Sequence, residues 1–329
     1  MFNVGIIGYG KIGKIRHKIL SKIKYVNIIS ICEENLDKKN YDNIFFTNKA
    51  SEVINNKLID TIFISVPNYL NKKFTIDSLK KNKNVFCEKP PALNSLEMKE
   101  IIKVEKKSQG KLMYGFNHRV HKSVFCMKTL IDSKKFGKIL WMRGRYGKSV
   151  NNDFFKSWRS KKKYAGGGIL MDQGIHMLDL FLYLSGSFDI VKSSISNQYW
   201  KSEVEDNAFV ILENSKTKVS ASLHSTMTQW RHLFSLEIFL QNGYLVLNGL
   251  KTSSNSYGKE ILTIVKNRSV APSATWNKEI EKKYQTDNSF YEEIKYFLRA
   301  IKNDSPIESS NSKDALKIME LIDKIYKNT

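Results

Sequence analysis

The hydrophobic positions in the first third of the chain form short continuous runs, separated by segments with helical spacing. Such runs are typical of parallel strands that are covered on both faces. The predicted strands cover residues 4–7, 26–31, 44–46, 61–66, 85–87 and 112–114, and the predicted helices cover residues 11–22, 70–81 and 95–107. The alternation of strands and helices predicts an α/β domain built on a parallel sheet.

The pattern changes after His118, where apolar and polar residues begin to alternate, as in strands with one covered face. The predicted strands cover residues 139–145, 207–212, 218–224, 234–240, 244–248 and 261–265. The predicted helices cover residues 122–132, 171–184, 288–302 and 313–326, and residues 151–165 are predicted to form a loop. We therefore predict a first domain over residues 1–118. The second, over residues 119–329, is an α/β domain with a large, mostly antiparallel open sheet, and its last helix is expected to pack back on the first domain.

A glycine-rich turn follows the first predicted strand and consists of Gly8, Tyr9, Gly10, Lys11, Ile12 and Gly13. Glycines at this spacing allow a tight turn and a close approach of the backbone to a pyrophosphate at a helix N-terminus. Glu33 lies twenty residues after Gly13, at the end of the second predicted strand, where it could bind a ribose 2′-hydroxyl. These features predict a Rossmann dinucleotide-binding domain. The alternative is a glycine turn in a sheet that binds no nucleotide.

The choice of cofactor depends on Glu33, since no arginine stands beside it to receive a 2′-phosphate. The sequence therefore favours NAD over NADP. Lys38 and Lys39 keep NADP as an alternative. Pro67 and Asn68 follow the fourth predicted strand, and we expect them to line the same crevice at the carboxyl ends of the strands.

Two distant segments carry side chains suited to alcohol oxidation. Lys89 follows a predicted strand, and Asp172 and His176 lie four residues apart on one face of a helix that glycines open. A histidine, with an ordinary pKa of about 6.5, suits the acceptor of a hydroxyl proton. Lys89 could stabilise the developing alkoxide, and Asp172 could orient the imidazole or bind a second hydroxyl. Each residue alone also fits a structural role, as a surface lysine, a core histidine or a helix-terminus carboxylate.

The net charge of +22 would by itself suggest a nucleic-acid partner. However, only eight of the 54 basic residues are arginines, the lysines are scattered, and no recognition motif is present. We therefore expect a solvated basic surface and no nucleic-acid partner. Cys32, Cys87 and Cys126 lie far apart and are expected to be reduced thiols, without a metal site. No apolar stretch approaches the roughly 18 residues of a membrane span and no leader is visible, so we expect a cytoplasmic protein without a membrane partner.

Taken together, these motifs resemble the glucose–fructose oxidoreductase / inositol dehydrogenase (Gfo/Idh/MocA) family. The resemblance rests on the glycine turn, Pro67-Asn68, Glu88-Lys89-Pro90, Trp158-Arg159, the glycines at 166–168 with Asp172, Gly174, His176 and Asp179, Glu205-Asp206 and Ser289-Phe290. It implies nicotinamide-dependent oxidation or reduction of a sugar, cyclitol or nucleotide sugar. It also implies a homodimer or homotetramer formed through the open sheet. The family's lysine, aspartate and histidine match Lys89, Asp172 and His176, and Glu88 and Lys89 join the residues expected to contact the cofactor.

Substrate contacts are expected from Lys89, Asp172 and His176 together with Asn117, Arg119, Trp158 and Arg159. An arginine here would suit hydroxyls, a carboxylate or phosphates. The lysines at 161–163 are expected to be solvated. Similarity of residues 228–232 and 256–258 to members from surface-carbohydrate pathways suggests such a role. The chain departs from the family at Asn71, where many members have a histidine, and at Val120-His121, where a proline is common. The alternative function is a catalytically silent sensor of NAD(P) or sugar with the same fold.

Overall fold

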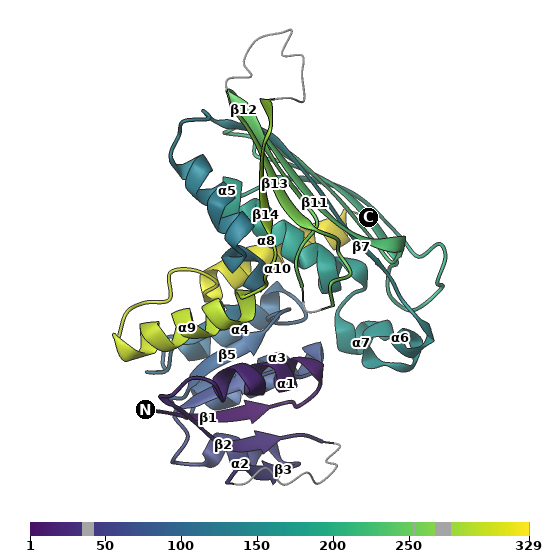
Figure 1. Ribbon diagram of the computed structural model, residues 1–329. Helices are drawn as coiled ribbons and strands as arrows, with labels where there is room; N and C mark the ends of the chain where they lie inside the picture. Colours follow the sequence, from purple (N-terminus) through teal and green to yellow (C-terminus); the bar gives the residue numbers. More distant parts are fainter. Residues whose placement is uncertain (35–42, 253, 267–277, 329) are drawn as a thin grey trace. The chain divides into compact units, whose positions relative to one another are not determined.

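The computed structural model describes residues 1–34, 43–252, 254–266 and 278–328 (Figure 1). The chain divides into two compact units. The first unit contains residues 1–116 and 290–319, and the second contains residues 117–289 and 320–329.

The first unit is built on a six-stranded sheet in which every pair of neighbouring strands is parallel. Its strands are β1 (Phe2–Ile7), β2 (Val26–Cys32), β3 (Phe45–Thr47), β4 (Thr61–Ile64), β5 (Asn84–Glu88) and β6 (Leu112–Gly115). The strand order is β3-β2-β1-β4-β5-β6, so the direction of winding reverses between β1 and β4. In such sheets, ligands bind outside the carboxyl ends of the strands at this reversal. The predicted Rossmann fold is confirmed.

The helices of the first unit pack around this sheet and are α1 (Lys11–Leu20), α2 (Ala50–Asn55), α3 (Asn68–Leu79), α4 (Ser95–Glu105) and α9 (Ser289–Lys302). Although α9 comes late in the chain, its apolar face belongs to the core of this unit. The ring of Phe297 lies 6.1 Å from that of Phe63 and 5.6 Å from that of Phe86. The sequence pattern did not predict α2, because this six-residue helix buries only Val53 and Ile54.

The second unit contains an eight-stranded sheet with the strand order β14-β13-β12-β11-β7-β10-β9-β8. The strands are β7 (Ile139–Ser149), β8 (Ile190–Ser196), β9 (Asn207–Glu213), β10 (Ser220–Thr226), β11 (Thr228–Leu240), β12 (Gly243–Asn248), β13 (Glu260–Lys266) and β14 (Ile280–Tyr284). Only β7 and β10 pair in parallel, which confirms the mostly antiparallel sheet. The sequence pattern missed β14, because this edge strand is polar and almost fully exposed.

Helices α5 (Lys122–Asp132), α6 (Asn152–Lys156), α7 (Lys162–Ala165) and α8 (Ile175–Ser185) belong to the second unit. The last helix, α10 (Ser312–Lys327), contributes its residues up to 319 to the first unit and the remainder to the second. The prediction of a loop over residues 151–165 is wrong. This segment forms α6, a 3₁₀ turn (Trp158–Ser160) and α7, and it buries Phe154, Ser160 and Ala165 beneath a polar sequence.

Helix α8 lies directly against the sheet of the second unit (Figure 1). The close approach requires Gly144 on β7, since a Cβ atom there would lie 2.4 Å from Met177 and 2.8 Å from Phe181. A π-helical turn (Leu170–Gly174) precedes α8, so the predicted helix over residues 171–184 begins with a wider turn than expected. Because Met177 packs against Gly144, the first turn of α8 lies in contact with β7.

The cysteines, the helix lengths and the clusters of metal-ligating side chains bear on the remaining expectations. Cys32 and Cys87 are buried and Cys126 is half-buried, and all three are free thiols. Among the described residues, every helix falls short of the length and apolarity that a membrane crossing requires. In the same part of the chain, no three His, Cys, Asp or Glu side chains gather in the way a metal ion would need.

Candidate active site

The glycine turn of the first unit is built for a close approach of backbone atoms. Gly8 has a φ of +90°, and a Cβ atom there would lie 2.4 Å from the carbonyl oxygen of Ser65. A Cβ atom on Gly13 would lie 2.0 Å from the carbonyl oxygen of Gly8. Gly10 is the N-cap of α1, and Lys11 and Ile12 begin that helix. The turn therefore places the backbone N–H groups at the start of α1 beside the carboxyl ends of β1 and β4, a geometry that suits a pyrophosphate.

Glu33 follows β2 and lies against this turn, because its Oε2 accepts a hydrogen bond of 2.6 Å from the backbone N–H of Tyr9. Its carboxylate is therefore held beside the glycines. Pro67 is the N-cap of α3, and Asn68 begins that helix and is buried. The predicted nucleotide-binding residues from β1, β2 and β4 thus lie at the carboxyl edge of one sheet.

Glu88, the last residue of β5, is engaged in a buried ion cluster. Its Oε1 accepts hydrogen bonds of 2.8 Å and 2.5 Å from Nε and Nη2 of Arg16, which is fully buried. Arg16 Nη1 also lies 2.6 Å from Glu293 Oε1. Burial acts to lower the pKa of Arg16, but the charges and hydrogen bonds of Glu293 and Glu88 outweigh it and raise that pKa. A cofactor contact of Glu88 stays a prediction.

The Arg16 cluster fixes Glu88, the residue that precedes Lys89, and the sequence pattern did not predict this cluster. The guanidinium lies 4.5 Å from the ring of Phe86 and 4.7 Å from the ring of Phe290, so it is sandwiched between aromatic faces. An arginine on a predicted surface helix normally reads as solvated. Only the close approach of β5 and α9 to α1 turns Arg16 into a core residue.

Lys89 follows β5 directly and is half-buried. The next peptide, Lys89-Pro90, is cis, and the carbonyl oxygen of Pro90 accepts a 2.8 Å hydrogen bond from Asn71 Nδ2. Asn71 is fully buried on α3. The residue that departs from the family pattern thus holds the segment that follows Lys89.

In the second unit, Glu205 fixes the glycine run that precedes Asp172. Its carboxylate accepts hydrogen bonds from the N–H groups of Gly168 (2.7 Å) and Leu170 (3.0 Å) and from the Tyr326 hydroxyl (2.9 Å). Burial raises the pKa of Glu205 in spite of these donors. A Cβ atom on Gly168 would lie 2.0 Å from the carbonyl oxygen of Glu205, so only glycine fits. The glycine run thus serves the attachment of the helix that carries Asp172 and His176.

Asp172 lies in the π-helical turn, and its Oδ2 forms an ion pair with Lys148 Nζ at the end of β7. Both side chains are mostly buried, with exposed fractions of 29% for Asp172 and 16% for Lys148. The sequence pattern did not predict a role for Lys148. The predicted strand ends at residue 145, and nothing distinguishes this lysine from the other lysines among the 46 in the chain.

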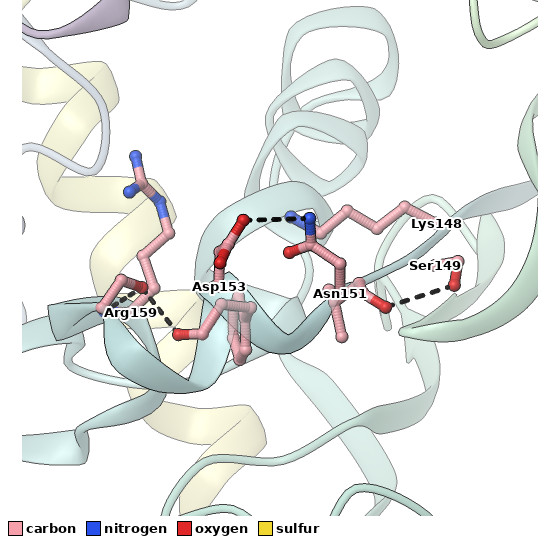
Figure 2. A pocket seen from close by; sticks show the side chains of 8 residues that line it. Lys148, Ser149, Asn151, Asp153 and Arg159 are labelled. Carbon is pink, nitrogen blue, oxygen red and sulfur yellow. Dashed lines mark hydrogen bonds between the residues drawn. The ribbon is translucent and has the colours of Figure 1, made fainter.

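A cavity of about 510 Å³ opens beside Lys148. Figure 2 shows Lys148, Asn151, Asp153 and Arg159 around it. The remaining lining residues are Ser149, Val150, Phe154 and Ser157. Of the predicted substrate residues, Arg159 lines this cavity. Its guanidinium lies 4.4 Å from the centre of the Trp158 ring.

His176, in the first turn of α8, is buried, with an exposed fraction of 6%. Its ring stacks on that of His118, with 3.9 Å between the ring centres and 19° between the planes. The sequence pattern did not predict a role for His118, since the contact joins residues 58 positions apart. The stacking fixes the plane of the His176 imidazole, and its role as a proton acceptor stays a prediction.

His118 belongs to a continuous chain of hydrogen bonds. Its Nδ1 lies 3.1 Å from Asn117 Oδ1, and its Nε2 lies 3.1 Å from the Tyr146 hydroxyl. Tyr146 is hydrogen-bonded to Tyr257, which accepts a 2.5 Å bond from Gln173 Nε2. Burial raises the pKa of Tyr146 well above its ordinary value, so its hydroxyl remains a donor. Since Asn117 Oδ1 can only accept, His118 Nδ1 donates in this bond, and in the neutral form of the ring Nε2 accepts from the Tyr146 hydroxyl.

Asn117 and Arg119, both predicted to contact substrate, are buried in the second unit. Asn117 donates a 2.9 Å hydrogen bond to Ser289 Oγ. Arg119 forms two hydrogen bonds with Asp179, of 2.9 Å from Nε and 2.6 Å from Nη2. These contacts give both residues a structural role, and their contact with a substrate stays a prediction.

The fold and these sites define a two-unit protein with a dinucleotide-binding Rossmann sheet and a histidine–aspartate pair on a helix. Residues 2–116 match the family model described as "Oxidoreductase family, NAD-binding Rossmann fold". Residues 126–246 match the model of the GFO/IDH/MocA C-terminal domain. The chain therefore belongs to the Gfo/Idh/MocA oxidoreductase family, as the sequence motifs predicted.

Two relatives illustrate the similarity. Levoglucosan dehydrogenase of Pseudarthrobacter phenanthrenivorans is 29% identical over 209 residues, which cover 59% of this chain and 54% of that protein. Glucose-6-phosphate 3-dehydrogenase of Bacillus subtilis is 32% identical over 202 residues, which cover 59% of this chain and 56% of that protein. The matched segments therefore span little more than half the length of these relatives.

Solved structures share the fold over nearly the whole chain. Levoglucosan dehydrogenase in complex with NADH and levoglucosan has a TM-score of 0.84 at 21% identity, covering 99% of this chain and 96% of that chain. A 3-ketoreductase from Actinomadura kijaniata in complex with NADP and TDP-benzene also has a TM-score of 0.84, at 15% identity, covering 99% of this chain and 97% of that chain. At these identities the likeness shows the fold alone.

Proposed function

We propose that this protein is a nicotinamide-dependent oxidoreductase that transfers a hydride between NAD(P) and a hydroxyl or carbonyl carbon of a sugar, cyclitol or nucleotide sugar. The observation that carries the proposal is the fixed geometry of the acid–base pair on one helix. His176 is stacked on His118, and Asp172, one turn earlier, is paired with Lys148. The relatives that are named dehydrogenases support the same class of reaction.

The residues of the first unit fit a dinucleotide. The backbone at Gly8, Gly10 and Gly13 would hold the pyrophosphate, and Glu33 would bind the adenosine ribose. Lys11, Ile12, Pro67 and Asn68 complete the edge where it would lie. When bound, the nicotinamide supplies the acceptor or donor of the hydride.

The chain's own residues would move the proton. His176 accepts the proton of the substrate hydroxyl as the hydride leaves the carbon, and returns it in the reverse direction. Lys89 is assigned to donate a hydrogen bond to the same oxygen, which stabilises the developing alkoxide. Asp172 orients the substrate or the imidazole, and Lys148 holds the Asp172 carboxylate in place.

The proposal is tested with a panel of sugars, cyclitols and nucleotide sugars, each incubated with NAD and with NADP. The absorbance of the reduced nicotinamide reports turnover. With a substrate found in this way, His176→Ala should lower kcat by about 10²–10⁴, because it removes the proton acceptor. Lys89→Ala should lower kcat at least comparably.

Neither variant should abolish NADH binding, since the nucleotide is held mainly by the glycine turn and Glu33. Calorimetry with NADH provides this control. Near-normal turnover in both variants would remove these residues from the mechanism and favour the catalytically silent sensor.

A further inference from the structure

Three aromatic side chains gather on the surface of the second unit and are here called the aromatic platform: Tyr199, Trp200 and Trp230. The ring of Tyr199 lies 5.1 Å from that of Trp230 and 4.9 Å from that of Trp200, and the two indole rings are 6.1 Å apart. Trp230 is 61% exposed and Tyr199 is 58% exposed. Because exposed clusters of large apolar side chains are uncommon in folded proteins, such a group indicates a binding surface.

Hydrogen bonds hold the segment that carries two of the three platform rings, Tyr199 and Trp200. Asp206, which is fully buried, accepts hydrogen bonds from the backbone N–H groups of Gln198 (3.1 Å), Tyr199 (2.8 Å) and Trp200 (2.9 Å). The indole N–H of Trp200 donates a 3.2 Å bond to the carbonyl oxygen of Met227. A surface already fixed in its binding conformation loses little entropy when it binds.

The platform adjoins the cavity beside Asp172. Phe154 lines the cavity, its ring lies 5.3 Å from that of Phe155, and Phe155 lies 5.2 Å from Trp200. Ser149, also in the cavity wall, pairs with Thr228, two residues before Trp230. Ring contacts therefore continue without a break from the cavity wall to the exposed indole.

Basic side chains are frequent in the segment that forms the cavity near Asp172. Residues 148–163 include six basic side chains and one acidic side chain, Asp153. Lys148 and Arg159 line the cavity, whereas Lys161 is paired with Glu203 at 2.8 Å. Lys148 has three N–H donors, so its contact with Asp172 leaves it able to bind an anion as well. Arginine and lysine at this place suit the oxygens of a phosphate.

We propose that the substrate is a nucleotide-activated sugar. The sugar lies at Asp172 and His176, the diphosphate lies against Lys148 and Arg159, and the nucleobase stacks on the aromatic platform. This rests on the proposed function and narrows its substrate class. A base stacks on aromatic side chains through its π-face, and such stacking contributes measurably to binding for any base. The cavity volume of about 510 Å³ falls within the range of about 300–1,000 Å³ typical of small-molecule sites.

The test measures binding to the full chain by tryptophan fluorescence and calorimetry, without turnover. The probes are UDP-glucose, UMP, glucose and cellobiose, the last being a two-ring sugar without a base. UDP-glucose and UMP should quench the tryptophan emission, and glucose and cellobiose should not. Trp230→Ala should raise the Kd for UDP-glucose by about five-fold or more, because it removes the stacking surface.

Trp230→Phe keeps a ring at this position and should retain most of the affinity. The matched control is Phe125→Ala on α5, since Phe125 is 65% exposed but lies outside the platform. That control should leave the Kd unchanged. Arg159→Ala should weaken the binding of UMP more than that of uridine.

The proposal is overturned if cellobiose binds as tightly as UDP-glucose, if Trp230→Ala binds UDP-glucose normally, or if Trp230→Ala dissociates an oligomer without changing the Kd. Should Trp230→Ala fail to fold, Tyr199→Ala tests the same surface with the same expected loss. Failure of the proposed function gives a different result. The protein would then bind UDP-glucose tightly, but no substrate would lead to reduction of a nicotinamide.

Discussion

At the scale of a single residue, we expect Glu33 to determine the preference between NAD and NADP. Its carboxylate lies against the glycine turn through the 2.6 Å bond from Tyr9, so a 2′-phosphate there would meet a like charge. We predict that NAD(H) binds more tightly than NADP(H), and that Glu33→Ser narrows or inverts the difference. Calorimetry with both cofactors checks this, with Glu34→Ser as the neighbouring control. A clear NADP(H) preference of the unmodified protein would contradict the prediction.

Spacing along the chain predicted the site residues that one local element brings together. Asp172 and His176 are four residues apart, so any helix brings them together. Lys148, His118 and Arg16 could not be found in this way, because each acquires its role through a contact with a distant element. A lysine at a strand end or an arginine on a helix carries no mark of burial until its partner is known.

At the scale of the element, Glu205 attaches the π-helical turn and α8 to the neighbouring backbone. Glu205→Gln places an amide NH₂ where an acceptor for Gly168 or Leu170 is needed, so we expect a loss of about 1–3 kcal/mol in the free energy of unfolding. Turnover should fall as well, because His176 lies on the attached helix.

The pH dependence of this effect has a definite sign. Burial raises the pKa of Glu205, so the folded protein holds the proton of this side chain more tightly than the unfolded chain does. The stability that this proton contributes is fully present below the ordinary glutamate pKa of about 4.3. That contribution is lost as the pH rises through the raised pKa. Thermal unfolding between about pH 4 and pH 8 should show this loss in the unmodified protein but not in Glu205→Gln. The control is Glu203→Gln, which neutralises an exposed carboxylate that pairs with Lys161 and accepts a hydrogen bond from the backbone N–H of Lys162. Identical pH profiles for Glu205→Gln and the unmodified protein would refute this role.

Elements with a strong apolar period were predictable, and those held by tertiary contacts were not. The parallel strands and α5 agree closely with their predicted ranges, because continuous apolar runs and a helical face are properties of the sequence itself. The segment 151–165 was misread as a loop, since its few buried side chains give no periodic signal. The π-helical turn could not be predicted either, because a π-helical turn has the same amino-acid composition as an ordinary α-helical turn.

At the scale of the whole molecule, the open sheet of the second unit suggests how copies of the chain associate. Helix α8 covers one face at Gly144, and the strand register places Trp141, Phe209 and Ile211 together on the other. Phe209 is 50% exposed and Ile211 is 59% exposed, and Trp141 stacks on Phe239 at 4.1 Å. The same face also carries Arg143 and Glu237, which form an ion pair of 2.7 Å, and a mixture of large apolar side chains and paired charges is typical of an interface between proteins.

We predict a homodimer or homotetramer that forms through this face. The double variant Phe209→Glu/Ile211→Lys adds no net charge, yet it should shift the protein to a monomer, because each subunit would bury charges in the interface. Light scattering after gel filtration measures the mass. Phe125→Lys, on a helix outside the sheet, should leave the mass unchanged. A monomeric unmodified protein would exclude the predicted assembly.

The π-helical turn at Leu170–Gly174 has a consequence for how the length of this segment can vary. Each residue of an α-helix turns the following side chain by about 100°. We expect the deletion of one residue from the turn to restore ordinary α-helical winding while Met177 and Phe181 keep their packing at Gly144. Asp172 would then point away from Lys148, while His176 kept its place. A chain shortened by one residue here should therefore keep its fold but lose the contact between Asp172 and Lys148. At this turn, relatives of unequal length can differ in chemistry without differing in architecture.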